Sequence, residues 1–491
     1  MEKSTANINS YTGNLLPLAV DLDGTLFTGD LLYESFLEFL KGSGPLMPIA
    51  FLQAVFQLLI GGRVGLKRFL ATRTSIDIEE LPYREDILSY VKSQKSLGRS
   101  VFLVSASDEL YVKKIATFLG CFDEGIGSNG TINLLGKAKA KYIVERFGEK
   151  GFDYIGDTDA DLHVWKHSSS GVSAGTEELT KMASAVTKIT ETFPVKRNTV
   201  PIIIRGIRVH QWVKNLLLFV PLFGAHKFLE IDRLMQVFLG FLSFSFLASS
   251  VYLTNDLIDI NSDRKHPKKK KRPIAAGTLS LSYAFILTPI LLALGFTTGY
   301  FVSKDFFGIL FIYFIITTLY SFYLKKVPLL DIILLASLYT IRIVAGTYAA
   351  NVYISKWLIA FSMFIFFSLA CVKRYSELQL MRSLSREKAE GRGYRSSDME
   401  QIGIFGTISG YIAILVSTLY ITSDEVATLY KNPEILWFIC PILFYWISRV
   451  WLLASRGDMH EDPIVFALRD KTSYIIGAVS AVIVLSAAMG V

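Results

Sequence analysis

Residues 281–324 read LSYAFILTPILLALGFTTGYFVSKDFFGILFIYFIITTLYSFYL, and this stretch decides the fold of the C-terminal part of the chain. It holds two apolar runs, 281–302 and 306–324, separated by a short polar connection. A helix needs about 20 predominantly apolar residues to cross the hydrocarbon core of a bilayer. The stretch therefore predicts two consecutive membrane-spanning helices.

Seven further runs of similar length and apolarity occur around it, so we expect an all-α membrane bundle of nine transmembrane helices in residues 208–491. The first run is the least certain because it opens with the polar residues Gln211, Lys214 and Asn215. The seven runs are centred near 211–226, 234–254, 329–349, 355–372, 402–422, 434–452 and 473–490.

The distribution of basic residues predicts how these spans are oriented in the membrane. If the N-terminal part and every second connecting segment face the cytoplasm, 25 Lys and Arg lie near that face and 5 near the opposite one. Because basic residues are retained on the cytoplasmic side, we expect a multi-pass protein of the cytoplasmic (inner) membrane whose N-terminal domain is cytoplasmic.

The composition agrees with this assignment. Of 491 residues, 51% are hydrophobic and 19% charged, which excludes a disordered chain. The net charge of +8 divides into −4 for residues 1–195 and +12 for residues 196–491. The basic excess lies in the apolar part, so the bilayer is expected as a partner and nucleic acid is not.

Residues 16–174 follow a different pattern, in which short apolar runs alternate with helix-length segments. Runs such as PLAVDLDGTL (17–26) and FDYIGD (152–157) are typical of buried strands that end in a polar turn. This alternation predicts an α/β Rossmann-like domain with a parallel sheet. We assign residues 1–180 to this domain, 181–207 to a linker and 208–491 to the membrane domain.

The segment Pro45–Ile60 is apolar enough to resemble another span. It is short, and a crossing here would place the strands that follow on the wrong side of the membrane. We therefore expect a helical cap over the α/β domain that is buried or lies on the membrane surface.

Polar residues follow the predicted strands. Asp21 and Asp23, in the sequence DLDGT, provide two carboxylates that can divide the work of phosphoryl transfer, one attacking phosphorus and one handling the leaving-group proton. The Ser105 hydroxyl could bind a phosphate oxygen. Lys137 or Lys139 could neutralise the phosphate, and Asp157 and Asp161 offer carboxylates for Mg²⁺. The alternative is a set of polar strand-end turns without catalytic function.

This set, in this order, resembles the haloacid dehalogenase superfamily of phosphatases over residues 15–180. The resemblance implies that Asp21 is the nucleophile that forms an aspartyl-phosphate and that Asp23 is the general acid and base. It also implies Asp157 as a ligand of Mg²⁺ supported by Asp161, with Ser105 and one of the two lysines holding the phosphate.

A second acidic cluster, NDLIDINSD (255–263), lies at the cytoplasmic end of the span near 234–254. On a continuous helix Asp256, Asp259 and Asp263 would project from one face. Clustered carboxylates repel one another unless a cation bridges them, so Mg²⁺ carrying a diphosphate is the expected occupant. A solvated acidic helix end is the alternative, but carboxylates entering a membrane bundle are costly and tend to be functional.

The basic run RKHPKKKKRPIAAG (264–277) follows directly. Attraction to anionic lipid headgroups could explain several of its lysines. Its position next to the acidic cluster favours binding of a diphosphate, with Lys268 and Arg272 as candidate ligands beside Asn255.

The NDxxDxxxD pattern and the nine spans resemble the UbiA superfamily of intramembrane prenyltransferases over residues 200–491. The second aspartate motif of that family, DxxxD, has only Asp331 as its counterpart here. A site with two complete metal clusters for a polyprenyl diphosphate is therefore not expected.

Five stretches resemble one branch of the superfamily, the decaprenyl-phosphate phosphoribosyltransferases: RxxQWVKN from 208, DRxHPxKxxRPIAAG from 263, YSxxLK from 320, KRYxE from 373 and GYR from 393. The resemblance implies phosphoribosyl diphosphate as donor and a polyprenyl phosphate lipid as acceptor. Residues that could bind the ribose 5-phosphate or the lipid phosphate are Arg208, Lys214, Tyr320, Lys325, Lys373 and Arg374. Some of these cations could instead determine topology, and Arg374 could pair with Glu377.

The fusion suggests two reactions in sequence, transfer of 5-phosphoribose to the lipid and removal of its 5-phosphate. An aromatic prenyltransferase and a non-catalytic membrane anchor for a phosphatase are the alternatives. His460 and Asp462 lie in a cytoplasmic segment and are weaker candidates for covering the transferase site.

Overall fold

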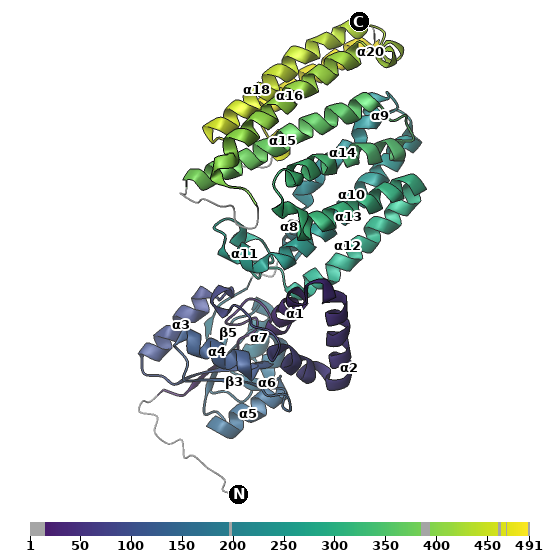
Figure 1. Cartoon of the computed structure of the whole chain (residues 1–491). Helices are drawn as coiled ribbons and strands as arrows, with labels where there is room; N and C mark the ends of the chain where they lie inside the picture. The colour runs from purple at the N-terminus through teal and green to yellow at the C-terminus, as the bar shows by residue number, and fades with distance from the viewer. Residues whose placement is uncertain (1–14, 196–198, 384–392, 460–462, 468, 490–491) are drawn as a thin grey trace. The chain divides into compact units, whose positions relative to one another are not determined.

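The computed structural model describes residues 15–195, 199–383, 393–459, 463–467 and 469–489. The chain forms two compact units (Figure 1). The first consists of Met1–Ile207 with Tyr252–Thr288, and the second of Arg208–Val251 with Pro289–Val491. The predicted end of the linker at residue 207 coincides with a unit boundary, but the segment 252–288 joins the first unit.

A six-stranded sheet forms the centre of the first unit. All of its strands are parallel, in the order β3-β2-β1-β4-β5-β6. The strands are β1 (Leu18–Val20), β2 (Val101–Asp108), β3 (Glu124–Ser128), β4 (Asp153–Gly156), β5 (Ser170–Ser173) and β6 (Lys188–Thr192). The predicted α/β class is confirmed.

Helices cover both faces of the central strands, and successive side chains of a strand point to opposite faces. Leu18 and Val20 pack with one helical layer, and Ala19 packs with the other. The first layer includes α3 (Glu85–Ser96) and α4 (Glu109–Leu119). The second includes α5 (Lys137–Phe147), α6 (Leu162–Trp165) and α7 (Glu177–Ser184).

The sheet extends further along the chain than the predicted domain. Helix α7 and strand β6 lie at Glu177–Thr192, a range of which 181–192 had been assigned to the linker. The exposed, polar strand β6 lacks the apolar run that marks a central strand, so the sequence pattern did not indicate it. Helix α8 (Thr199–Gly206) follows it.

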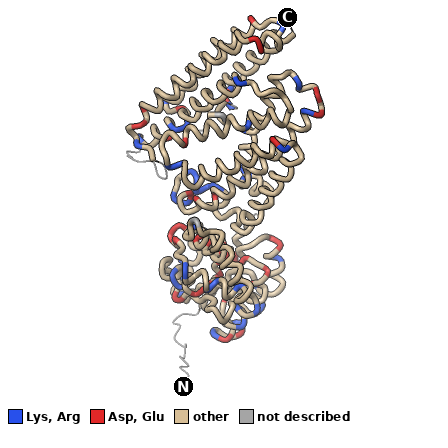
Figure 2. Tube along the Cα trace, turned by 45° about the vertical axis from the view of Figure 1, so that its right-hand side comes forward, with Lys and Arg blue, Asp and Glu red and all other residues tan. Residues whose placement is uncertain are grey.

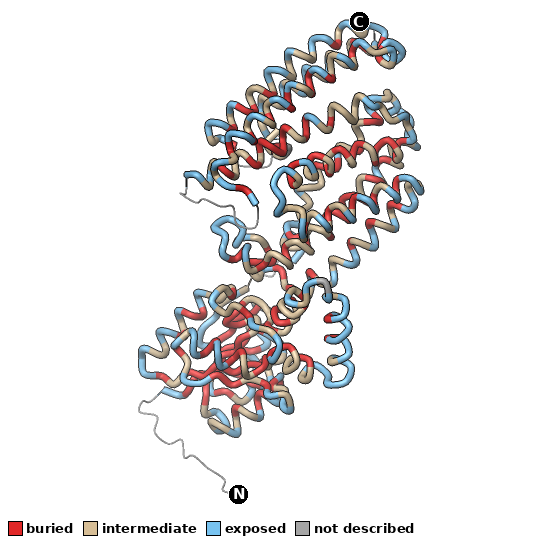
Figure 3. Tube along the Cα trace, viewed as in Figure 1, coloured by how far each residue is buried: buried red, intermediate tan, exposed pale blue. Residues whose placement is uncertain are grey.

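Helices α1 (Leu31–Gly42) and α2 (Met47–Ala71) form a hairpin at the expected place of the cap. The backbone of α2 leaves helical geometry at Gly62. The apolar part of α2 before this kink is therefore shorter than the roughly 20 residues that a membrane span requires. Strands β1 and β2, which flank the hairpin in sequence, are neighbours in one sheet. The hairpin therefore cannot cross the membrane once, although α2 is exposed along most of its length (Figure 3).

Among the described residues, nine helices are long and apolar enough to cross a membrane, and α2 is one of them. Charged residues in this region gather at helix ends and connections (Figure 2). The other eight helices are α10 (Ile231–Ile258), α12 (Leu281–Val302), α13 (Lys304–Phe322), α14 (Leu330–Ala350), α15 (Lys356–Ser383), α16 (Met399–Ile421), α18 (Ile439–Arg456) and α20 (Lys471–Met489). Shorter helices between them are α17 (Asp424–Leu429) and α19 (Pro463–Ala467).

The expected span near 211–226 has a different form. A 3-10 helix, η4 (Val209–Phe219), continues into the short helix α9 (Val220–Gly224). At about 2.0 Å per residue for a 3-10 helix and about 1.5 Å for an α-helix, the two pieces together reach the thickness of a hydrocarbon core. Gly346 of α14 lies against the backbone of Leu218, so this segment packs closely on the bundle.

Candidate active sites

The carboxyl ends of three neighbouring strands, β2, β1 and β4, meet at one edge of the sheet. This edge brings together Asp21 and Asp23 after β1, Ser105 in β2 and Asp157 after β4. Ligands of open α/β sheets bind outside the carboxyl ends of the strands. The residues predicted for phosphatase chemistry therefore lie at the edge where such a site belongs.

Asp21 and Lys139 form a buried ion pair at this edge, with Lys139 Nζ 2.8 Å from Asp21 Oδ1. Lys139 lies in the first turn of α5, whereas Lys137 is exposed to solvent. Burial raises the pKa of Asp21 to about 8, and the charge of Lys139 acts in the opposite direction. Burial also lowers the pKa of Lys139, but Asp21 and Asp161 outweigh this effect and the net pKa is raised.

The Asp23 carboxylate is held from two sides. Ser105 and Ser107 donate hydrogen bonds to its Oδ2 atom at 2.9 and 2.6 Å. The backbone N–H of Leu31, in the first turn of α1, donates to Oδ1 at 2.9 Å. Ser107 was not predicted, although its spacing of two from Ser105 in one strand places both hydroxyls on the same face.

Asp21, Asp157 and Asp161 each offer a carboxylate oxygen, and the three atoms lie within 4.8 Å of one another. Buried carboxylates gathered in this way suit a divalent cation. Asp161 Oδ2 already accepts hydrogen bonds from the backbone N–H groups of Asp157 and Thr158, and its Oδ1 accepts from Tyr154. Asp161 therefore holds the loop that carries Asp157.

Gly24 makes this close gathering possible. Its φ of +82° lies in the left-handed region, and a Cβ at this position would overlap the Asp157 carboxylate. Thr25, the next residue, donates a hydrogen bond to Asp157 Oδ1 at 2.8 Å. The sequence DLDGT thus supplies the two catalytic candidates and also the contacts that place Asp157.

The second acidic cluster departs from the predicted single helix face. Helix α10 ends at Ile258, and α11 (Ile260–Lys265) begins after Asp259, so the helix is interrupted within the cluster. Asp256 and Asp263 are nevertheless both buried. Arg272 Nη1 lies 3.2 Å from Asp256 Oδ1 and 2.6 Å from Asp263 Oδ2. A guanidinium thus bridges two carboxylates that the sequence had assigned to a bridging cation.

The residues next to this cluster differ in their exposure to solvent. Asn255 and Asp259 are half-buried, and the backbone carbonyl of Asn255 accepts a hydrogen bond from Asp259 N at 2.9 Å. Lys268 is exposed at the start of the short 3-10 turn η5 (Lys269–Lys271). Of the two basic residues predicted here, Arg272 contacts the carboxylates and Lys268 faces solvent.

The predicted residue Lys214 lies next to a buried polar network of the second unit. Lys214 and Asn215 are buried on η4, and Lys214 Nζ lies 5.6 Å from the centre of the Tyr339 ring. Arg342 Nε donates to Asn215 Oδ1 at 2.8 Å, and its Nη2 donates to Tyr313 at 2.9 Å. Arg342 lies within α14 and was not predicted as a site residue, so its link to Asn215 was not anticipated.

Arg374 is almost completely buried and bonds to both Asp331 and Glu377. Asp331 also accepts a hydrogen bond from the Tyr394 hydroxyl, and that hydroxyl accepts one from Leu329 N at 2.7 Å. The structural alternative considered for Arg374 thus agrees with its contacts. Asp331, the only counterpart of the second aspartate motif, therefore belongs to the same hydrogen-bonded network as Arg374.

The remaining predicted residues of the second unit are half-buried. They are Arg208, Tyr320, Lys325 and Lys373. Arg208 has a left-handed backbone with a φ of +56° directly before η4. His460 and Asp462 lie outside the described residues.

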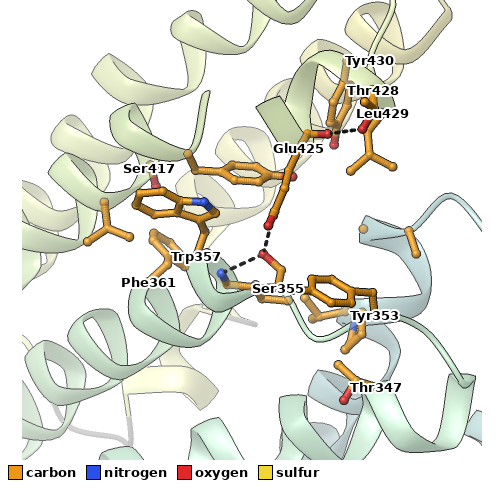
Figure 4. A pocket seen from close by; sticks show the side chains of 17 residues that line it. Thr347, Tyr353, Ser355, Trp357, Phe361, Ser417, Glu425, Thr428, Leu429 and Tyr430 are labelled. Atoms are coloured by element: carbon orange, nitrogen blue, oxygen red, sulfur yellow. Dashed lines mark hydrogen bonds between the residues drawn. The ribbon is translucent and has the colours of Figure 1, made fainter. Parts of the chain in front are cut away.

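A cavity of about 460 Å³ lies in the second unit (Figure 4). Its lining includes the end of α14 at Thr347, the start of α15 at Trp357 and the segment around Glu425. Ser355 donates a hydrogen bond to Glu425 at 3.5 Å. The cavity is at the other end of α14 from Asp331, and none of the predicted site residues lines it.

An acid-rich edge of a parallel sheet and a set of apolar helices define a multi-pass membrane protein that carries a hydrolase-type α/β domain. Residues 217–471 match the UbiA prenyltransferase family, and residues 18–166 match the haloacid dehalogenase-like hydrolases. The chain belongs to the UbiA prenyltransferase family, and it is an enzyme of that type with an N-terminal haloacid dehalogenase-like domain.

Two relatives differ in how much of the chain they match. The protein y4nM of Sinorhizobium fredii is 37% identical over 95% of this chain and 90% of its own length. A decaprenyl-phosphate phosphoribosyltransferase of Mycobacterium tuberculosis is 33% identical over 57% of this chain and 91% of its own length. A UbiA homolog from Archaeoglobus fulgidus bound to GPP and Mg²⁺ has a TM-score of 0.44 at 19% identity, covering 58% of this chain and 97% of its own.

Proposed function

We propose that the protein is a bifunctional membrane enzyme. The membrane domain transfers 5-phosphoribose from phosphoribosyl diphosphate to a polyprenyl phosphate, and the N-terminal domain removes the 5-phosphate to leave polyprenylphosphoryl ribose. The observation that carries the proposal is the presence of two separate clusters of buried carboxylates in one chain, each completed by a cationic side chain. Similarity to decaprenyl-phosphate phosphoribosyltransferases supports the first reaction.

In the transfer, an oxygen of the lipid phosphate attacks C1 of the ribose, and the bond from C1 to the diphosphate breaks. The acceptor is already anionic, so the reaction needs no separate base. Asp256 and Asp263 are buried carboxylates of the kind that bind a divalent cation, and Mg²⁺ held by them would stabilise the leaving diphosphate. Arg272, which lies between the two carboxylates, is placed to bind a phosphate group of the donor.

In the second reaction, Asp21 attacks the phosphorus of the 5-phosphate and Asp23 protonates the departing C5 oxygen. Asp23 then accepts a proton from the water that attacks the aspartyl-phosphate, which releases phosphate and regenerates Asp21. Lys139 holds Asp21 in place and offsets its charge. Mg²⁺ at Asp21 and Asp157 would neutralise charge on the phosphate oxygens.

The sequence around Asp331 argues against an aromatic prenyltransferase. That reaction would require a second metal cluster for the polyprenyl diphosphate, and the positions four residues before and after Asp331 are Val327 and Leu335, which offer no carboxylate. The transferase proposal needs only the cluster at Asp256 and Asp263.

The decisive experiment supplies radiolabelled phosphoribosyl diphosphate, Mg²⁺ and polyprenyl phosphate to the purified full chain in detergent. We expect the ribose label to enter the lipid fraction. The aromatic prenyltransferase would be established by two results together: the label stays in the aqueous phase under all conditions, and the protein transfers a prenyl chain from a polyprenyl diphosphate to an aromatic ring. An anchor without transferase activity would give neither product, and Asp256→Ala would then change no activity.

A further inference from the structure

The segment that joins α10 to α12 packs on the phosphatase domain within the first unit. Arg264 Nη2 lies 2.6 Å from Glu34 Oε1 and Arg264 Nη1 lies 3.2 Å from Glu34 Oε2, and only about 5% of either side chain is exposed. A bidentate pair of this kind fixes both position and orientation. Asn261 donates to Glu38 at 3.0 Å, which adds a second link between this segment and α1.

The same segment approaches the catalytic loop at Gly277. The backbone there has a φ of +70°, and a Cβ would overlap the hydroxyl of Thr28. Thr28 Oγ1 donates to the carbonyl of Ala276 at 3.4 Å. Thr28 lies five residues after Asp23, so the connecting segment reaches the immediate surroundings of the predicted general acid.

A cavity of about 590 Å³ opens between these parts of the first unit. Its lining includes the phosphatase residues Asp23, Asp157 and Thr158. It also includes Thr278, Ser280 and Tyr283, from the end of the connecting segment and the start of α12. The hydroxyl groups of these three residues suit a sugar, and α12 itself is apolar enough to continue into a bilayer.

We propose that residues 277–283 form a substrate-recognition wall of the phosphatase site, so that the phosphatase acts on a sugar phosphate whose other end is anchored in the membrane. This inference rests on the proposed function and specifies the substrate class of its second reaction. Asp21 and Asp23 perform the chemistry on any phosphomonoester, and the wall selects the lipid-linked one. Glu34 is a positioning residue, because its side chain holds Arg264 and it is not among the residues that line the cavity.

The test compares two substrates on the full chain in detergent, a purified lipid-linked 5-phosphoribose and the soluble ester p-nitrophenyl phosphate. We expect Glu34→Gln to raise KM for the lipid substrate at least tenfold with kcat within twofold, and to leave both constants for the soluble ester within twofold. The matched control is Asp153→Asn, which breaks a partly buried ion pair with Arg99 at the opposite end of the strands and should affect both substrates equally.

A cross-link tests whether the connecting segment lies on the phosphatase domain. Lys265 Nζ lies 3.0 Å from Asp77 Oδ2 and both side chains are accessible, so a carbodiimide should join them and hold together the two fragments cut at a protease site inserted between Val195 and Thr199. If the fragments separate on a denaturing gel after carbodiimide treatment, or if Glu34→Gln changes both substrates alike, the recognition wall is refuted. If the cross-link forms but the wild-type protein releases no phosphate from the lipid substrate, the second reaction of the proposed function fails and the assigned substrate class fails with it.

Discussion

At the scale of single residues, the phosphatase site depends on which lysine faces Asp21. The pKa of Asp21 is about 8 because the carboxyl is buried, even though the nearby Lys139 lowers it. Without that cation the pKa would rise further, and a larger fraction of Asp21 would be protonated and unable to attack phosphorus at neutral pH.

We therefore expect Lys139→Met to lower kcat for phosphate release by about 100-fold or more. Lys137→Met is the matched control, because it removes the same charge two residues away from an exposed position, and its kcat should stay within twofold of the wild type. Phosphate release from p-nitrophenyl phosphate measures both. Equal losses in the two variants would mean that the positive charge of the helix end, and not the contact of Lys139 with Asp21, supports catalysis.

Gly24 links the nucleophile loop to the proposed metal site. In Gly24→Ala the new methyl group would overlap the Asp157 carboxylate and displace it. We expect the Mg²⁺ concentration needed for half-maximal phosphatase activity to rise about tenfold or more, as when the supports of a metal ligand are lost. A titration of activity with Mg²⁺ measures this, and the transferase activity of the same preparation controls for folding. An unchanged Mg²⁺ requirement would remove Asp157 from the proposed ligand set.

At the scale of elements, Asp331 and Arg374 join the first turn of α14 to the C-terminal half of α15. Both side chains are buried, and the Tyr394 hydroxyl closes the network. Removing one partner of a buried ion pair leaves an uncompensated charge, which costs about 3–5 kcal/mol. A partly exposed pair contributes at most about 1 kcal/mol.

We accordingly expect Asp331→Asn to lower the Tm of the detergent-solubilised protein by several degrees. Glu377→Gln should shift it far less, because Glu377 is 42% exposed while bonded to the same guanidinium. Thermal unfolding followed by circular dichroism measures both variants. A loss of transferase activity in Asp331→Asn at an unchanged Tm would instead assign Asp331 to a second metal cluster.

The same elements show what the sequence could predict. Apolar length and strand-to-turn patterns were sufficient for the parallel sheet and for most of the spans, because both depend on local composition. The 3-10 geometry near 211–226 and the edge strand β6 were not predictable, because they depend on packing against distant residues such as Gly346 and on pairing with β5. The interruption at Asp259 was missed for a related reason: a favourable spacing of carboxylates does not establish that the helix continues through them.

Within both sites, the sequence motifs identified the catalytic and metal-binding candidates, but they did not identify the residues that position them. Asp21, Asp23 and Asp157 follow strands in a recognisable order, so parallel topology alone brings them together. Glu34 had no such signal, because its partner Arg264 lies 230 residues away in the chain. Spacing also could not show that Arg272 contacts both carboxylates whereas Lys268 faces solvent.

At the scale of the whole molecule, the two proposed reactions have separate acid clusters, so each should be removable alone. Asp21→Asn keeps the size of the nucleophile but removes its charge, while the carboxylates at Asp256 and Asp263 are unaffected. With labelled phosphoribosyl diphosphate, this variant should accumulate lipid-linked 5-phosphoribose where the wild type forms lipid-linked ribose. Chromatography of the lipid fraction, before and after treatment with an added phosphatase, distinguishes the two products.

The reciprocal variants remove the carboxylates proposed for the transferase reaction. Asp256→Asn should give no labelled lipid, because the cation proposed to stabilise the leaving diphosphate would lose a ligand. The same variant should release phosphate from supplied lipid-linked 5-phosphoribose at close to the wild-type rate. Asp263→Asn should behave in the same way, since Arg272 bridges the two carboxylates. If either transferase variant also lost phosphatase activity toward the soluble ester, the clusters would not be independent. The fusion would then have to be explained by a single shared site and not by two consecutive reactions.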